Sequence, residues 1–293
     1  MSKSSKQGRQ QHARRVDAGV DAFAREVLAD IERGNESLRV WSKDVQRLLD
    51  ELNAPKPPTA RLSQLVALDP RLAVTTMHAA QSPVFGQLAT PSLDLQQTIF
   101  ALGAERLRAI VVGAGVAQLP EQPRLQHWRR EVLALGTSSI RTSAICMLVA
   151  PHVVGTDVVE AFLLGMLHNV GRFCLYARLR DAGEWREDTQ QRLLLMSRWH
   201  ARVGAAMVRH WALPGALADA IESQDQLGRA DDADLRGEML AAAVVAARTA
   251  HAVDETAAHL AEFSRTGLDR ARWQAVLGAV PATVDALRAL LHR

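Results

Sequence analysis

AFLLGMLHNVGRFCLY, residues 161–176, is apolar up to His168 and Asn169 and becomes apolar again after Gly171. Apolar residues at this density over sixteen positions favour a buried helix. The two polar residues inside the stretch have two explanations. They are either the remains of a metal site or polar residues at the end of a helix.

The rest of the chain repeats the helical pattern. Apolar residues recur at spacings of three and four, strict alternation is almost absent, and we therefore predict an all-α fold. Ser42, Asp69-Pro70 and Thr156-Asp157 mark helix starts, and Gly103 suits a helix C-terminus. We expect helices near residues 16–31, 45–52, 59–68, 70–80, 95–103, 105–112, 127–150, 157–176, 192–211, 215–223, 236–252, 254–263 and 281–292.

Composition predicts a folded protein. Apolar residues make up 48% of the 293 positions, which is enough for an ordinary buried core. The longest unbroken apolar run is nine residues, 239–247, whereas a membrane span needs about 20, so we expect no membrane-spanning helix. The first fifteen residues lack the apolar middle of a secretory signal, and we expect a cytoplasmic protein. Cys146 and Cys174 lie in apolar stretches and are interpreted as reduced core thiols.

Charge and prolines suggest the domain organisation. Residues 1–15 carry five positive charges and no acid, and the remaining 30 basic residues face 32 acidic ones, a net charge of −2. The body is therefore not a basic platform for nucleic acid. The tail could touch phosphates or anionic lipid weakly, but we favour a solvated, disordered end. We expect a basic tail (1–15), an N-terminal helical subdomain (16–125) and a second helical subdomain with a C-terminal extension (126–293).

Several stretches, taken in order, resemble the HDOD family, helical bacterial signalling modules related to HD-type metal phosphohydrolases. LSQLVALDPRLAVTTMHAAQSPVFG (62–86) is similar to the family's run of a helix, Asp-Pro, a second helix and an Asn-Ser-x-x-Phe-Gly loop, with Gln81 in place of the Asn. TPSLDLQQTIFALGAERLRAIVV (90–112) resembles the next element. In the second half, AFLLGMLHNVGRF (161–173) and HARVGAAMVRHWALPGALADAI (200–221) resemble the family's AFLAGLLHDIGKL and His-to-Trp-x-Leu-Pro elements.

The resemblance covers roughly residues 38 to 250 and implies a fold. It implies a helical N-terminal subdomain packed on a degenerate HD-like subdomain. An HD-type hydrolase needs imidazoles and carboxylates on a metal that lowers the pKa of a bound water. By resemblance, the ligand positions are occupied here by Arg130, His168 with Asn169, His200, Gln224 with Asp225, and Ala247.

Only two imidazoles remain at these positions. Two neutral imidazoles alone are a weak site for a divalent ion, so we expect no metal, no other cofactor, no catalytic residues and no enzyme activity. The alternative is a metal-dependent phosphohydrolase or phosphodiesterase with an unconventional ligand set. A further hypothesis is that Arg130, His168, Asn169 and His200 converge into a pocket for a small anion.

Structural roles for the same residues are also open. His168 could hydrogen-bond a free carbonyl at a helix C-terminus, Asn169 could end a helix in the left-handed conformation, and His200 could pack in the core. Arg130 could point into solvent.

The resemblance implies a regulatory function. We expect a non-enzymatic bacterial module that binds a signalling protein in trans, in cyclic-dinucleotide, stress or motility signalling, and does not bind nucleic acid or membrane. The candidate partner surfaces are a groove between the two subdomains and the helices beyond residue 250. ALRALLHR (286–293) could pack on the body or dimerise, and we favour packing.

Overall fold

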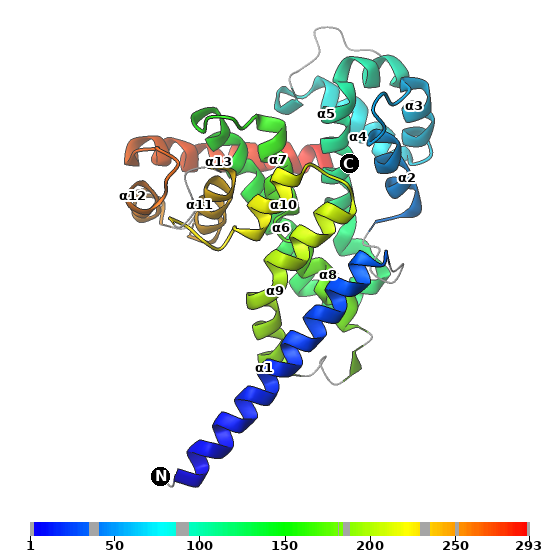
Figure 1. Cartoon of the computed structure of the whole chain (residues 1–293). Coiled ribbons are helices and arrows are strands. Elements are labelled where there is room, and N and C mark those ends of the chain that lie inside the picture. The colour runs from blue at the N-terminus through cyan, green and yellow to red at the C-terminus, as the bar shows by residue number, and fades with distance from the viewer. Residues whose placement is uncertain are drawn as a thin grey trace.

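A computed structural model of the chain describes residues 3–34, 41–85, 94–180, 182–183, 188–228, 235–249 and 252–291, with side chains for all of these except 3–15, 84 and 263. These residues form α-helices and short 3₁₀ turns, and the described ranges contain no strand (Figure 1). The predicted all-α fold is therefore confirmed.

The α-helices follow one another with short connections. They are α1 (Lys3–Glu32), α2 (Lys43–Leu52), α3 (Thr59–Ala67), α4 (Pro70–Gln81), α5 (Leu95–Gln118), α6 (Arg129–Val149), α7 (Val158–Leu167), α8 (Val170–Leu179), α9 (Thr189–His210), α10 (Gly215–Glu222), α11 (Leu235–Thr249), α12 (Val253–Phe263) and α13 (Arg270–Leu291). The 3₁₀ turns are η2 (Pro83–Phe85), η3 (Leu119–Glu121), η4 (Pro123–Trp128) and η5 (Ala150–His152).

Local signals in the sequence predict several helix ends correctly. The side chains of Ser42, Asp69 and Asp157 accept hydrogen bonds from backbone N–H groups in the first turns of α2, α4 and α7. Gly103 has φ 77° and ψ 166° inside α5, so the two predicted segments are joined across a kink that only this residue type adopts easily. Capping and glycine chemistry therefore set the boundaries that periodicity alone leaves open.

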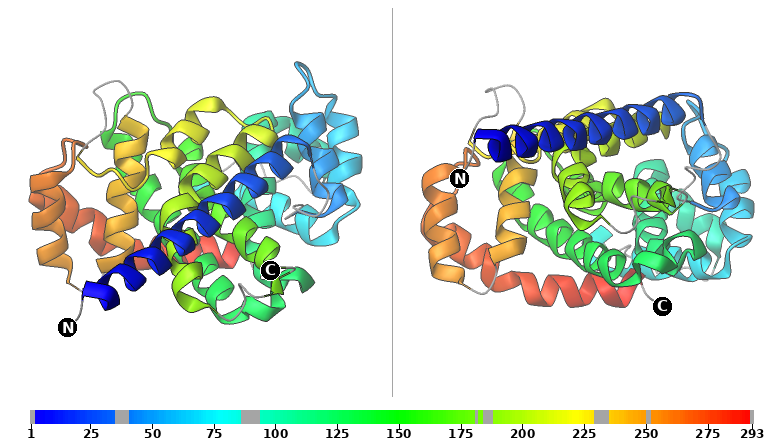
Figure 2. Two further views of the ribbon diagram at one scale, coloured as in Figure 1. Left: turned by 60° about the horizontal axis from the view of Figure 1, so that its bottom comes forward. Right: turned by 90° about the horizontal axis from the view of Figure 1, so that it is seen from below.

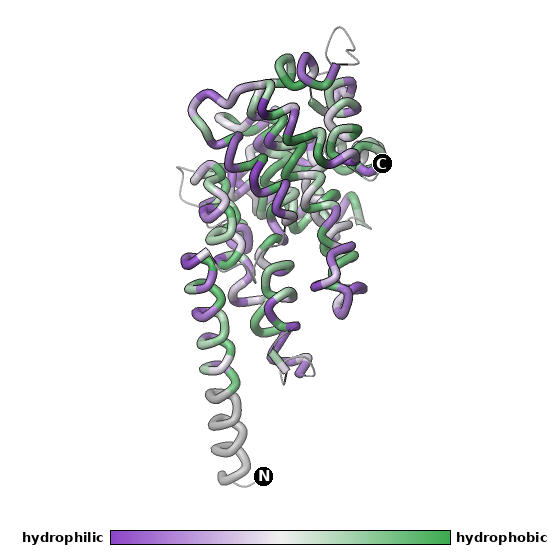
Figure 3. Tube along the Cα trace, turned by 90° about the vertical axis from the view of Figure 1, so that its right-hand side faces the viewer, coloured by the Kyte–Doolittle hydropathy of each residue, from purple (hydrophilic) through white to green (hydrophobic). Residues whose placement is uncertain are grey.

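The first helix differs from the prediction for the tail and bears on the predicted domain organisation. It begins at Lys3, so residues 3–15 have a helical backbone and not the disordered one we expected; the segment contains no proline and is rich in Lys, Gln and Arg, which are good helix formers. In addition, α1 packs on α9, which lies in the second half of the chain. Figure 3 shows that hydrophilic and hydrophobic residues alternate along its described part.

Polar contacts fix α1 to the second half. Trp199 Nε1 donates to Asp21 at 3.0 Å, and Arg178 forms an ion pair with Glu26 at 2.7 Å. The apolar stripe of α1 is completely buried at Val20, Ala24 and Val27. The apolar face of α1 thus packs on α9, and the predicted division into subdomains 16–125 and 126–293 stays a prediction.

The last helix crosses the molecule on the face opposite α1 (Figure 2). α13 packs on α6 and α12 and reaches α4 and α5 in the N-terminal half. A Cβ atom added to Gly113 of α5 would meet the ring of Phe162 and, at 3.4 Å, Leu291. Leu287, Leu290 and Leu291 are buried, which confirms the prediction that this segment packs on the body.

Three helical stretches, Pro123–His152, Val158–Leu179 and Arg270–Leu291, are long and apolar enough to cross a membrane by length and composition alone. Counting unbroken apolar runs missed them, because a window tolerates one or two charges. In the first two, 61% and 78% of the apolar window is buried inside the protein, so core packing accounts for their composition. The absence of membrane binding and the cytoplasmic location stay predictions.

Two glycines allow the central helices to approach closely. A Cβ on Gly165 of α7 would overlap the backbone of Ser143 on α6. A Cβ on Gly171 of α8 would overlap the carbonyl of His200 and the amide of Gly204 on α9. Backbone against backbone cannot be relieved by a side-chain rotation, so these glycines determine where α7 and α8 lie.

We expect Gly171→Ala to lower the free energy of unfolding by about 1–3 kcal/mol, because α8 and α9 must separate to admit the methyl group. The matched control is Gly278→Ala in α13, where an added Cβ meets nothing within 4 Å. It should raise the free energy by about 0.5–1 kcal/mol, since Ala loses less entropy in a helix. Urea denaturation of both variants checks this. A Gly171→Ala protein as stable as the parent would contradict the close approach.

Candidate functional site

The His168–Asn169 pair lies at the junction of α7 and α8. The chain was predicted to be one helix here, but α7 ends at Leu167 and α8 begins at Val170. His168 is the C-cap of α7, and Asn169 is the N-cap of α8 with φ −96° and ψ 0°. Asn169 is therefore not left-handed, as one prediction had it. Both side chains are buried, at 2% and 1% exposed.

His168 forms the hydrogen bond expected at a helix end. Its Nδ1 donates to the carbonyl oxygen of Gly165 at 2.7 Å. The structural role predicted for this residue is thus confirmed. The bond also fixes the tautomer and leaves Nε2 as the acceptor, an arrangement that metal-binding histidines share.

Asn169 uses both ends of its amide. Nδ2 lies 3.3 Å from the Leu135 carbonyl oxygen and 3.5 Å from Ser139 Oγ, both on α6. Oδ1 accepts a 2.6 Å hydrogen bond from Nη1 of Arg172. A carboxylate at this position would set an oxygen against the Leu135 carbonyl, so the amide suits this contact better than the aspartate of the related hydrolases.

His200 approaches the junction from α9. Its side chain is 2% exposed, and its Nε2 lies 3.3 Å from Oδ2 of Asp225. Burial lowers the pKa of His168 to about 3, and the positive charges of Arg172 and Arg248 act in the same direction. Burial, followed by the charge of Arg172, also lowers the pKa of His200 to about 3. Both imidazoles are therefore neutral at neutral pH.

Gln224 also lies at the site. Its Nε2 donates to the carbonyl of His168 at 3.2 Å and to that of Ile221 at 2.9 Å, and its Oε1 is buried without a hydrogen-bond partner. The residue at this predicted ligand position therefore ties α10 to the end of α7. Ala247 is buried on α11 and precedes Arg248, whose charge acts on both histidines.

Arg130 is the predicted site residue that does not converge. It is exposed in the first turn of α6, and the α6 atoms that contact Asn169 belong to Leu135 and Ser139. Leu135 and Ser139 lie about one and a half and two and a half turns beyond Arg130 along the helix, so counting two places from Trp128 stopped too early. The structure brings together His168, Asn169 and His200, with Gln224, and leaves Arg130 in solvent.

Two arginines supply the positive charge that was expected from Arg130. Arg172 is three residues beyond Asn169 on α8, and Arg248 lies near the end of α11. Burial, and then the charge of Arg248, lowers the pKa of Arg172 to about 10, so it stays cationic at neutral pH. The signal for Arg172 was its helical spacing from Asn169, but nothing in the sequence relates Arg248 to it.

The donor set does not fit a divalent metal ion. Asn169 Oδ1 is engaged by a guanidinium, Gln224 bonds backbone carbonyls, and two arginine charges act on the histidines. Within the described part of the chain, no group of three or more His, Cys, Asp or Glu side chains is placed to hold a metal. Of the carboxylates in the described segments, that of Asp225 lies beside His200, and a cation bound there would also meet the two positive charges.

The sequence matches the HDOD domain over residues 38–227, which is more than half of the chain. The chain belongs to the HDOD family. No curated protein matches it. The match includes the first two resembling stretches and the junction of α7 and α8, and it ends before α11, α12 and α13, so those helices lie outside the family domain.

Solved structures share the fold of this HDOD protein. A Shewanella amazonensis protein described as a "Putative metal-dependent phosphohydrolase" has a TM-score of 0.66 at 14% identity and covers 89% of this chain and 99% of its own. A Geobacter sulfurreducens HDOD protein of unknown function has a TM-score of 0.58 at 18% identity, and the alignment covers 92% of this chain and 99% of that protein. A Marinobacter aquaeolei protein described as a "Putative signal transduction protein" has a TM-score of 0.55 at 16% identity, and the alignment covers 86% of this chain and 59% of that protein. These likenesses show the fold alone.

The two cysteines of the chain lie in this half of the molecule. Cys146 on α6 and Cys174 on α8 are free and buried, as predicted. Burial raises the pKa of Cys174 to about 12, so the thiol is not a nucleophile at neutral pH.

The hypothesis that a small anion binds at His168, Asn169 and His200 stays a prediction. The positive charge near these residues comes from Arg172 and Arg248 and not from Arg130.

The lowered pKa values of His168 and His200 predict that the folded protein becomes less stable in acid. Between pH 6.5 and about 3 the unfolded chain binds protons on His168 and His200 that the folded protein does not bind. The free energy of unfolding therefore falls as the pH decreases through this window, by at most about 1.4 kcal/mol per pH unit for each histidine. Urea denaturation as a function of pH measures this slope.

His200→Gln should reduce the slope, because it removes one of the two buried imidazoles whose pKa is lowered in the folded protein. Equal slopes for the parent and His200→Gln would show that His200 is protonated in the folded state as it is in the unfolded one.

Proposed function

We propose that this HDOD protein is a non-enzymatic bacterial signalling module that acts by binding a partner protein in trans. The observation that carries the proposal is the Asn169–Arg172 pair at the centre of the HD-like half. A hydrolase needs a carboxylate there to hold a metal and orient water. Here an amide and a guanidinium are bound to each other, which supports a structural use of this centre.

The alternative function is that of a metal-dependent phosphohydrolase or phosphodiesterase. It is favoured by the tautomer of His168, whose Nε2 is left as an acceptor, and by the similarity in fold to the Shewanella amazonensis protein described as a "Putative metal-dependent phosphohydrolase". His200 and Asp225 would supply further donors. The positive charges of Arg172 and Arg248 weigh against it, because a divalent ion must be bound beside them.

Metal analysis separates these two functions. We expect the purified protein to contain well under one divalent ion per chain after equilibration with Mn²⁺ or Zn²⁺, and no hydrolysis of bis(p-nitrophenyl) phosphate or cyclic dinucleotides. Asn169→Asp should not create a site, because Arg172 is placed to pair with the new carboxylate. The double variant Asn169→Asp, Arg172→Gln removes that cation and should bind metal more tightly than the single variant.

A stoichiometric ion in the parent protein, together with hydrolysis that is lost on His168→Ala, would establish the enzyme and overturn the proposal.

The groove between the two halves is our proposed partner surface. Two adjoining hollows lie here, one of about 230 Å³ between α5, α7 and α10 and one of about 390 Å³ between η2, α5 and the start of α7. Both are lined by Glu105, Asp157 and Val159. The two hollows adjoin along α7, so an extended segment of a partner could occupy both.

The chemistry of the groove indicates what that segment carries. Arg108 is held by the carbonyl of Leu52 at 2.6 Å, and Glu160 is paired with Arg236 at 2.7 Å. Glu105 lies on the exposed surface of α5, next to the apolar Val159. A partner segment with one basic and one apolar side chain would suit this lining.

Glu105→Lys should weaken binding of a partner captured with the parent protein by about tenfold or more, because it reverses the charge in the groove. Glu262→Lys, on the exposed surface of α12, is the matched control and should bind as the parent does. Calorimetry with the purified pair measures both. Equal affinities for the parent and Glu105→Lys would place the partner elsewhere.

We propose that the protein acts in cyclic-dinucleotide, stress or motility signalling, in the cytoplasm and without binding nucleic acid.

A further inference from the structure

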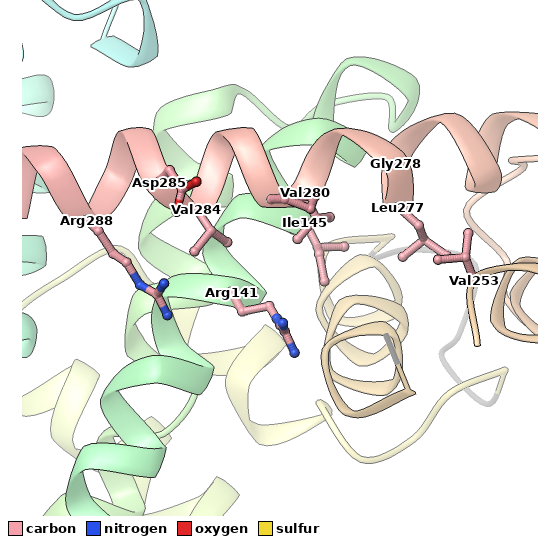
Figure 4. Close-up of a pocket in the computed structure, with 10 residues that line it drawn as sticks. Arg141, Ile145, Val253, Leu277, Gly278, Val280, Val284, Asp285 and Arg288 are labelled. Carbon is pink, nitrogen blue, oxygen red and sulfur yellow. The ribbon is translucent and has the colours of Figure 1, made fainter. Parts of the chain in front are cut away.

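A second groove lies where α13, which follows the family domain, passes over α6 of that domain and the start of α12. It encloses about 340 Å³ and is lined mainly by α13 (Figure 4). Cavities of this size are at the lower end of the range for small-molecule sites. Arg141 and Ile145 belong to the HDOD match, which ends at residue 227, and the other lining residues lie beyond it.

The floor of the groove is apolar. Ile145 of α6 is fully buried beneath it, and Leu277 and Val280 of α13 are 6% and 5% exposed. Val253, at the start of α12, is one of the few large apolar side chains with substantial exposure, at 37%. A hydrocarbon group in the groove would cover this surface, and each buried methylene would contribute about 0.8 kcal/mol.

Two arginines give the groove a positive end. Arg141 projects from α6 and Arg288 from the last turns of α13, and both line the groove (Figure 4). Arg141 has one long hydrogen bond, 3.4 Å to the carbonyl of Ala247, and Arg288 has none to a described residue. The groove also contains one acid, Asp285, but no ion pair joins it to either arginine within the described residues.

Two residues of α13 open the groove. Gly278 has no side chain, and a Cβ atom added there would meet nothing within 4 Å. Pro281 lies inside the helix and has no N–H, so it cannot donate to the carbonyl of Leu277 one turn earlier. The wall therefore offers room, and Pro281 leaves the Leu277 carbonyl without its usual donor four residues further on.

We propose that this groove binds a small amphipathic anion, a carboxylate or phosphate ester attached to a hydrocarbon chain or ring. The anionic head lies between Arg141 and Arg288, where guanidinium groups form charge-assisted hydrogen bonds. The hydrocarbon part covers Leu277, Val280 and Val253. The site is independent of the protein-binding function proposed above.

Octyl phosphate and octanoate are suitable probes, with octanol as the uncharged control. Isothermal titration calorimetry on the full chain should show binding of at least one of the two anions below the millimolar range and weaker binding of octanol. The stronger of the two anions identifies the head group as phosphate or carboxylate. Arg288→Gln should weaken that binding by about tenfold or more, since a charge-assisted bond is lost.

Gly278→Phe tests the groove itself, because the new ring enters open space. It should abolish binding of the anion while the melting temperature of the free protein falls by no more than a few degrees. Arg272→Gln, an exposed arginine at the start of α13 that does not line the groove, is the control and should bind as the parent does. Anion binding that is unchanged in both Arg288→Gln and Gly278→Phe would overturn the proposal, as would equal affinity for octanol or no binding by either anion.

Discussion

The backbones of four helices come into direct contact at two glycines, and the polar centre of the molecule depends on this approach. Gly165 places α7 against α6, and Gly171 places α8 against α9. They are six positions apart in the sequence, and His168 and Asn169 lie between them. With both neighbouring helices so close, the two polar side chains are buried wherever they point, so each must find partners inside the protein.

The partners they find explain why the centre differs from that of a hydrolase. Asn169 meets a carbonyl on one side and a guanidinium on the other, and an amide, which both donates and accepts, satisfies the two at once. Gln224 only donates, from Nε2 to the carbonyls of His168 and Ile221. Residues that count as lost ligands in an alignment are thus the donors of a buried hydrogen-bond network that joins α6, α7, α8 and α10.

The sequence predicted the helices far better than the site. Capping is a local interaction, so the helix starts at Ser42, Asp69 and Asp157 could be predicted from the sequence. The spacing of the apolar residues was equally informative, because each helix buries one face. The break between α7 and α8 was missed because both sides of it are buried, so the apolar pattern continues through it. His168, Asn169 and His200 were placed correctly together, since the family pattern carries their relative positions. Arg130 was misplaced because short motifs do not determine register along a 21-residue helix. Arg248 was not predicted at all, because its proximity to the histidines arises from tertiary packing.

The path of α13 has a consequence for the order in which the molecule folds. Leu291 packs near Gly113 and Phe162, so the core between α5 and α7 is completed by residues about 180 positions further along the chain than Gly113. Helices α2–α5 leave the ribosome long before α13 has been synthesised. The N-terminal half must therefore wait with part of its apolar surface uncovered, and its final closure is coupled to the synthesis of the last helix.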